Sequence, residues 1–153
     1  MSVESPRFAS LLPVVTDGPE TTEALGARLA LRLVPGDVLA LHGDLGAGKT
    51  HLVRGLIAGL GGDPVQVTSP TFTLVHEYAT AELLVYHVDA YRLDHPDEFR
   101  RIGGEEILES EDAIAVVEWP ERLGDFLPRG TVHVTLRHGG GDVREIQEGM
   151  GDR

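Results

Sequence analysis

The chain of 153 residues contains no cysteine. Thiol catalysis, thiolate metal sites and disulfide scaffolds are therefore excluded, because each of them requires a cysteine side chain. Aromatic residues make up only 5% of the chain, and no run approaches the roughly eighteen apolar residues of a membrane span. Residues 1–10 lack the basic and apolar segments of a signal peptide. We expect a cytoplasmic protein that does not contact a membrane.

Basic residues are also scarce: 13 Lys and Arg stand against 25 Asp and Glu, which gives a net charge of −12. Broad, direct contact with nucleic acid needs a basic face, so this charge argues against it. An acidic surface could suit a basic protein partner, or it could only keep the chain soluble. Both interpretations stay open. There is a single lysine, Lys49, and it lies inside the sharpest motif of the sequence.

That motif is a phosphate-binding loop of the form G-x-x-x-x-G-K-[ST]. Its residues are Gly43, Asp44, Leu45, Gly46, Ala47, Gly48, Lys49 and Thr50. Glycines let backbone N–H groups converge on phosphate oxygens, and the following helix adds the positive end of its dipole. Lys49 should reach the β- and γ-phosphates, and the Thr50 hydroxyl should ligate Mg²⁺. The loop predicts a nucleoside triphosphate and magnesium as ligands.

Hydrophobic spacing predicts alternating helices and strands around this loop. Helices are expected at residues 20–33, from residue 48 to about 59–62, and at 96–102. Strands are expected at residues 11–15, 37–42, 65–67, 71–78, 82–88, 113–117 and 131–137, the first at a sheet edge because Pro13 interrupts it. Residues 142–147 give no clear prediction, and residues 148–153 should form a loose tail. The pattern indicates one domain over residues 1–153, a three-layer α/β P-loop NTPase fold with a mixed, partly parallel sheet.

Two carboxylates follow predicted strands and are candidates for the metal. Asp89 ends the run ELLVYHVD and Glu118 ends AIAVVE. Carboxylates at the ends of neighbouring parallel strands converge on the crevice where ligands bind. Glu118 follows the more apolar strand and is the better metal ligand, which leaves Asp89 to orient water or the outer shell of the ion. Together with Lys49 they are the predicted catalytic residues, and the two acidic roles could be exchanged.

Other residues allow two interpretations. Trp119, the only tryptophan, could stack beside the nucleotide or only pack. Ser69, Pro70 and Thr71 could form a switch-like loop that senses the γ-phosphate, or an ordinary turn. His42, His76 and His87 are expected on strands with structural roles, because their spacing does not demand a metal.

Three functions remain open from the residues alone: an ATPase, a small-molecule kinase, and a nucleotide-dependent binding module. Guanine-specific GTPases use an Asn/Thr-Lys-x-Asp motif, which this chain cannot form because its one lysine is in the loop. Adenine is therefore the expected base. A kinase stays possible because Arg92, Arg100 and Arg101 could clamp a transferred phosphoryl group.

The phosphate loop is accompanied by four further motifs: LVRGL, TSPTFTLVHEY, YHVDAYRL and VEWPERL. In this order and spacing, from about residue 22 to 144, they resemble the TsaE (YjeE) family of bacterial tRNA threonylcarbamoyladenosine biosynthesis. His51 stands where the family often has a second threonine, and Phe72 where tyrosine is common.

The resemblance implies a P-loop ATPase that binds the complex of TsaD and TsaB. ATP hydrolysis there would support repeated modification of adenosine 37 in ANN-decoding tRNAs, with tRNA contacted only indirectly. It also implies that Thr50 and Glu118 ligate magnesium, that Asp89 is a functional site residue, and that residues 69–71 are switch-like. Thr22, Trp119 and Arg144 are expected to add nucleotide contacts.

Overall fold

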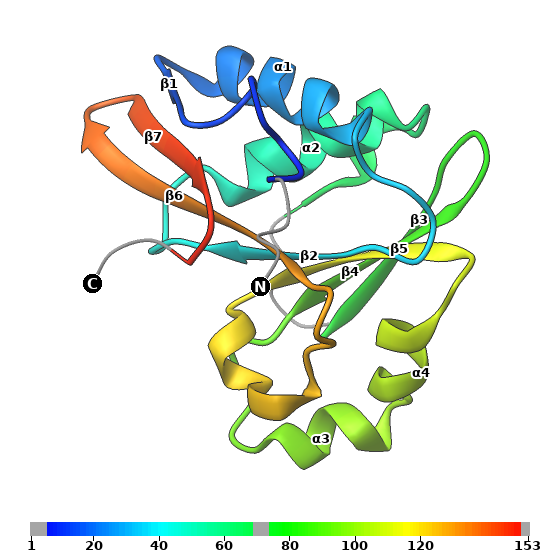
Figure 1. The fold of residues 1–153 in the computed structure, drawn as a ribbon. Coiled ribbons are helices and arrows are strands. Elements are labelled where there is room, and N and C mark those ends of the chain that lie inside the picture. The colour runs from blue at the N-terminus through cyan, green and yellow to red at the C-terminus, as the bar shows by residue number, and fades with distance from the viewer. Residues whose placement is uncertain (1–5, 69–73, 151–153) are drawn as a thin grey trace, which may run out of the picture.

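The computed structural model describes residues 6–68 and 74–150. Within these residues seven strands form one sheet in the order β1-β7-β6-β2-β5-β4-β3 (Figure 1). The central pairs β6–β2, β2–β5 and β5–β4 are parallel, whereas β1–β7, β7–β6 and β4–β3 are antiparallel. The prediction of a mixed, partly parallel sheet is confirmed. The strands are β1 (Val14–Thr16), β2 (Val38–His42), β3 (Val75–Ala79), β4 (Leu84–Asp89), β5 (Ala113–Glu118), β6 (Val132–Gly140) and β7 (Val143–Glu148).

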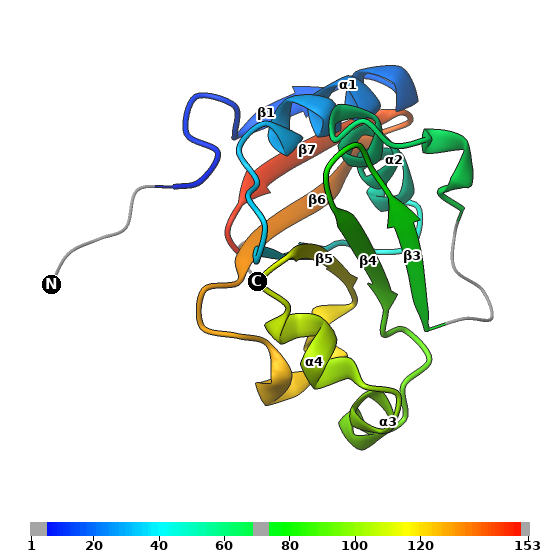
Figure 2. The same ribbon diagram turned by 90° about the vertical axis from the view of Figure 1, so that its right-hand side faces the viewer.

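Helices cover both faces of this sheet, which makes the three predicted layers (Figures 1 and 2). On one face lie α1 (Pro19–Ala30) and α2 (Lys49–Gly59), and on the other lie α3 (Pro96–Arg101) and α4 (Gly104–Glu109). Short 3₁₀ turns add η1 (Pro64–Gln66), η2 (Pro120–Arg122) and η3 (Gly124–Phe126). No helix in the two described ranges is long and apolar enough to cross a membrane.

Strands β2 and β5 are apolar up to their last residue because each of their faces lies against helices. Along β2, Val38 joins the core on the α3–α4 side, while Leu39 and Leu41 join the core beneath α1 and α2. Every residue of β5 is buried. Continuous apolar runs of this kind are typical of parallel strands covered on both sides, which is why the sequence indicated both strands correctly.

Several elements differ from the sequence-based prediction, and β1 begins only at Val14, after Pro13. The strand expected at residues 65–67 is wrong: Asp63 accepts a hydrogen bond from the Val65 N–H at 3.0 Å and begins a 3₁₀ turn instead. Helix α4 was not predicted, because it lacks the first-turn proline that marks the start of α3. The unassigned residues 142–147 form most of β7, which needs few apolar residues because it lies near the sheet edge.

The loose tail expected from residue 148 is wrong at its first residue, which belongs to β7. Glu148 is the last residue of β7, and its carboxylate accepts hydrogen bonds from the backbone N–H groups of Arg7 and Phe8 at 2.8 and 2.7 Å. The Gly149 N–H then donates to the His133 carbonyl at 2.7 Å. These contacts fasten the beginning of the chain and its last strand to each other.

Helices α1 and α2 approach each other through glycines. A Cβ added at Gly55 of α2 would lie 2.0 Å from the carbonyl oxygen of Glu23 in α1. One added at Gly26 of α1 would lie 2.3 Å from the carbonyl oxygen of Leu52. Both obstacles are backbone atoms, which cannot move unless a whole helix moves. The backbone separation of the two helices is therefore set by glycine.

We predict that Gly55→Ala lowers the free energy of unfolding by about 1 to 3 kcal/mol, the usual cost of overpacking. Alanine is intrinsically better than glycine in a helix by about 1 kcal/mol, but a contact at 2.0 Å outweighs that preference. Urea unfolding measures the change. Gly130→Ala is the matched control, because its Cβ would meet nothing within 4 Å, and we expect a change within about 0.5 kcal/mol. Equal stabilities of the two variants would contradict the argument.

Candidate nucleotide-binding site

The predicted phosphate loop connects the end of β2 at His42 to the start of α2 at Lys49. Gly46 and Gly48 have φ angles of 81° and 100°, a backbone region that side chains disfavour. A Cβ at Gly43 would lie 2.8 Å from the Leu136 carbonyl oxygen. Gly48 caps α2 without a side-chain hydrogen bond. The first N–H groups of the helix have no partner within the helix, so they are suited to bind an anion.

A cavity of about 470 Å³ opens beside this loop. It collects ten residues that the sequence analysis proposed as nucleotide, metal or catalytic residues: Thr22, Leu45, Gly46, Gly48, Lys49, Thr50, Asp89, Glu118, Trp119 and Arg144. The other three loop residues, Gly43, Asp44 and Ala47, lie along a separate hollow behind the loop, next to β6. Ser69, Pro70 and Thr71 lie outside the described residues.

Six further residues line the cavity and were not predicted as nucleotide contacts: Gly18, Pro19, His51, Tyr91, Arg92 and Asp142. Tyr91 and Arg92 follow Asp89 in the YHVDAYRL motif, so their position beside a candidate catalytic acid was a usable signal. Gly18 and Pro19 begin α1, and their approach to the loop depends on the packing of α1 against α2, which the sequence does not reveal.

The ammonium group of Lys49 is held in a nearly dry position, with the residue only 5% exposed. Its Nζ donates to the Gly43 carbonyl oxygen at 2.6 Å and lies 4.0 Å from the centre of the Trp119 ring. Burial lowers the pKa of Lys49, and the carboxylates of Glu118 and Asp89 act against that shift. A triphosphate in the cavity would supply further negative charge to this ammonium group.

Trp119 packs, as one of its two interpretations predicted, and it also lines the cavity. Its ring packs against the core on the α3–α4 side and lies 4.9 Å from the ring of Tyr91, while also facing Lys49. Its φ of 56° places a bulky residue in the left-handed region, at a cost of about 1 to 3 kcal/mol. This backbone turn separates Glu118, at the end of β5, from the 3₁₀ turn η2 that Pro120 begins.

The two candidate carboxylates are direct neighbours in the sheet. Strands β4 and β5 are parallel, with Asp89 opposite Glu118, and Glu118 is in turn opposite Leu41 of β2. Glu118 is 5% exposed. Asp89 is half-buried, and its Oδ1 accepts a hydrogen bond from the Tyr91 N–H at 3.0 Å. Burial raises the pKa of Asp89 above its ordinary value, although this hydrogen bond acts in the opposite direction.

Behind Glu118 lies a polar contact that the sequence analysis missed. His87 Nε2 is 2.5 Å from Glu118 Oε2, and His87 Nδ1 is 3.1 Å from the Tyr78 hydroxyl. All three residues are buried. Burial, followed by the charge of Glu118, raises the pKa of Tyr78. The available signal was the alternation of side chains along β4, which puts His87 on the same face as Asp89.

The oxygen groups around Lys49 suit magnesium. A threonine hydroxyl and carboxylates are the hard ligands that this ion prefers, and it usually keeps several waters and takes others from phosphate. Among the residues described, no group of three His, Asp or Glu side chains is arranged to hold a metal by itself. An ion here would need the triphosphate as a co-ligand, with Thr50 and Glu118 as protein ligands and Asp89 nearby.

Contacts between elements build the rim of the cavity. Arg144 of β7 donates from Nη2 to the Gly46 carbonyl at 3.0 Å, so it ties the edge of the sheet to the loop. His51 Nδ1 lies 2.9 Å from Glu23 Oε2, which joins α2 to α1. The hydroxyls of Thr22 and Thr16 are 2.7 Å apart. These contacts fix the positions of Thr22 and Arg144 beside the loop.

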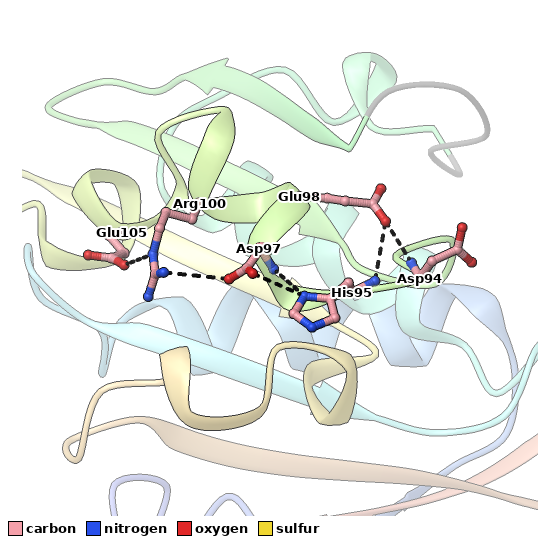
Figure 3. A network of polar contacts seen from close by, with 6 residues as sticks. All are labelled: Asp94, His95, Asp97, Glu98, Arg100 and Glu105. Atoms are coloured by element: carbon pink, nitrogen blue, oxygen red, sulfur yellow. Dashed lines mark hydrogen bonds and ion pairs between the residues drawn. The ribbon is translucent and has the colours of Figure 1, made fainter.

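The arginine clamp expected of a kinase is not assembled. Arg100 Nε donates to Glu105 at 2.6 Å, and its Nη1 lies 3.5 Å from Asp97, both on the α3–α4 layer (Figure 3). Neither Arg100 nor its neighbour Arg101 lines the cavity, whereas Arg92 does. Two of the three arginines proposed for a clamp therefore belong to a different part of the molecule.

Comparisons with known proteins identify the family. The family model described as "Threonylcarbamoyl adenosine biosynthesis protein TsaE" matches residues 16–146. A Bacillus subtilis protein named tRNA threonylcarbamoyladenosine biosynthesis protein TsaE is 40% identical over 131 residues, covering 86% of this chain and 80% of that protein. A Synechocystis protein of the same name is 46% identical over 105 residues, covering 67% of this chain and 66% of that protein. The crystal structure of Bacillus subtilis YdiB matches with a TM-score of 0.70 at 34% identity, covering 90% of this chain and 83% of that one. By its motifs, its sequence relatives and its fold, the chain belongs to the TsaE family.

Proposed function

We propose that this chain binds ATP with Mg²⁺, hydrolyses it, and serves tRNA threonylcarbamoyladenosine biosynthesis. The observation that carries the proposal is the convergence of Lys49, Thr50, Asp89 and Glu118 on one cavity at the start of α2. Relatives that cover most of the chain are named for this biosynthesis. The ATPase chemistry rests on the geometry of the site.

Each residue has a distinct part in the proposed reaction. The N–H groups of the loop and of the first turn of α2 bind phosphate oxygens, and Lys49 neutralises charge at the β- and γ-phosphates. Thr50 and Glu118 would hold magnesium, which supplies charge neutralisation between those phosphates. Asp89, whose raised pKa makes it a better proton acceptor than an exposed aspartate, orients the attacking water.

Two alternatives have less support. A small-molecule kinase would need cationic groups for a transferred phosphoryl group, and only Arg92 of the proposed clamp lines the cavity. A binding module without turnover would have little use for a second, half-buried carboxylate next to Glu118, which burial alone disfavours. Adenine remains the expected base, because the sequence cannot form the lysine-containing guanine motif.

We predict that Mg²⁺-ATP raises the melting temperature of the protein. A ligand that binds only the folded state adds about 2.7 kcal/mol at a hundredfold excess over Kd. Lys49→Ala should remove most of this shift, because it deletes the buried cation that faces the phosphates. Differential scanning fluorimetry with ATP and GTP measures both affinity and base preference. A wild-type melting temperature that saturating nucleotide leaves unchanged would refute nucleotide binding.

Substitutions of the acidic and hydroxyl residues should separate metal binding from hydrolysis. Thr50→Ala and Glu118→Gln should weaken Mg²⁺-dependent nucleotide binding more than metal-free binding. Asp89→Asn should reduce hydrolysis with a smaller effect on affinity. Asp89→Asn should also raise the free energy of unfolding of the ligand-free protein at pH 7. The pKa of Asp89 is raised in the folded state, so the ionised carboxyl lowers the free energy of unfolding once the pH exceeds that pKa. This stabilisation should disappear below the pKa of the aspartate in the unfolded chain, because the carboxyl is then protonated in both states. If Glu118→Gln has no effect and nucleotide binding by Asp89→Asn no longer depends on Mg²⁺, then Asp89 is the metal ligand and the roles of the two carboxylates are exchanged.

We further propose that the protein acts on tRNA through the TsaD–TsaB complex and not by binding tRNA itself. The net charge of −12 would repel a polyanion. In the one adjacent arginine pair, Arg100 is bound to the acids Asp97 and Glu105 (Figure 3). A basic face for tRNA would need clusters of cations without such partners.

Anisotropy titrations should therefore detect binding of the ATP-loaded protein to the TsaD–TsaB complex, but not to ANN-decoding tRNA alone at physiological salt. Omitting ATP should weaken the interaction with the complex, because the loop and its surroundings respond to the nucleotide. Tight binding to tRNA by the isolated protein, without affinity for the complex, would contradict this part of the proposal.

A further inference from the structure

Glu118 is held from behind by two buried hydrogen bonds in series. The Tyr78 hydroxyl lies 3.1 Å from His87 Nδ1, and His87 Nε2 lies 2.5 Å from Glu118 Oε2. The exposed fractions are 2% for Tyr78, 0% for His87 and 5% for Glu118. These three residues come from three adjacent strands, β3, β4 and β5. Both hydrogen bonds therefore lie inside the sheet, shielded from solvent.

The direction of the hydrogen bonds follows from the chemistry of the groups. An ionised carboxylate can only accept, so His87 Nε2 carries the proton and donates to Glu118. In a neutral imidazole the other nitrogen, Nδ1, is then an acceptor, and the Tyr78 hydroxyl donates to it. Glu118 thus selects the tautomer of His87, and the Tyr78 hydroxyl, which donates to Nδ1, holds the ring in place. One oxygen of Glu118, Oε2, is occupied in this way, which leaves Oε1 to the cavity that Glu118 lines.

We propose that Tyr78 and His87 are positioning residues that orient the Glu118 carboxylate for magnesium. This inference rests on the proposed function, since it assigns a role to residues behind the same site. His87 holds one carboxylate oxygen so that the other faces the metal, and Tyr78 holds the His87 ring in the required orientation. Neither residue lines the cavity, so both act through Glu118.

Two physical costs explain why such support is needed. A buried carboxylate without hydrogen-bond partners is strongly disfavoured, and a charge-assisted bond offsets that cost. A glutamate side chain also has three rotatable bonds, so an unsupported Glu118 would lose conformational freedom on binding the ion. Removal of outer partners of metal ligands typically weakens metal affinity by about 10- to 100-fold.

A purely structural role is the alternative, in which His87 only fills the core and satisfies its own nitrogens. Substitutions of similar size distinguish the two. His87→Leu removes both hydrogen bonds. His87→Gln retains a donor, because its amide nitrogen is as many bonds from Cβ as Nε2 is in histidine. Tyr78→Phe removes only the hydroxyl. Tyr86→Phe is the matched control, because Tyr86 lies on β4 but packs against the opposite core.

The experiment measures the apparent affinity of the protein–ATP complex for Mg²⁺. Trp119 is the only tryptophan and lies in the site, so its fluorescence reports binding directly. ATP is titrated in EDTA to obtain the metal-free Kd, and Mg²⁺ is then titrated at saturating ATP. Melting temperatures without ligand establish that each variant is folded.

We expect His87→Leu to weaken Mg²⁺ affinity by about 10- to 100-fold and Tyr78→Phe by about two- to tenfold, as for one lost hydrogen bond. His87→Gln should recover most of the loss, and metal-free ATP binding should be unchanged throughout. Tyr86→Phe should match the wild type.

Wild-type Mg²⁺ affinity in His87→Leu, or an equal loss in His87→Gln and His87→Leu, would overturn the proposal. If His87→Leu does not fold, Tyr78→Phe and His87→Gln decide by themselves: wild-type affinity in Tyr78→Phe with a loss in His87→Gln would overturn it. A wild-type protein that does not bind ATP, or binds it without any effect of Mg²⁺, would instead refute the proposed function. The two failures are therefore distinguishable before any variant is made.

Discussion

The burial of one ammonium group organises this site. Lys49 is 5% exposed, and a cation in such a place must be compensated from several directions. The Gly43 carbonyl, the face of Trp119 and the carboxylates of Glu118 and Asp89 supply that compensation. Each of them depends on a different part of the chain: the loop, the left-handed turn after β5, and the ends of two strands. The position of Lys49 therefore depends on the pairing of β2, β5 and β4, which links folding to the proposed phosphate site.

The strand order brings these compensating groups together. With β2 beside β5 and β5 beside β4, all parallel, the strand that leads into the loop and the strands that end in Glu118 and Asp89 finish at one edge. Asp89 and Glu118 are placed opposite each other, which raises the pKa of Asp89 in addition to the effect of burial. The same register aligns His87 behind Glu118. A shift of β4 by one residue would turn both His87 and Asp89 to the other face, so the site is sensitive to strand register.

The predictable part of this molecule was the part governed by local pattern. The loop, the continuous apolar strands and the strand-end acids are each visible in a few consecutive residues, and five of the eight loop residues line one cavity with both acid candidates. Contacts between distant elements were not visible. His87 was interpreted as structural because the spacing of the histidines does not demand a metal, and its contact with Glu118 appears only once β4 is paired with β5. The 3₁₀ turn at Pro64–Gln66 was missed because the apolar Val65 and Val67 suggested a strand, whereas the Asp63 side chain determines the turn.

Stability is given up at several points where the site needs a particular geometry. Trp119 adopts a left-handed backbone, the Asp89 carboxyl group is half-buried, and the Lys49 ammonium group is buried. Close packing elsewhere offsets these costs. Helix α1 reaches α2 through Gly26 and Gly55, and this contact brings Thr22 and the start of α1 to the cavity. The glycines therefore serve the site as well as the fold: a larger residue would push α1 outward, and it would move one wall of the cavity away from the phosphate loop.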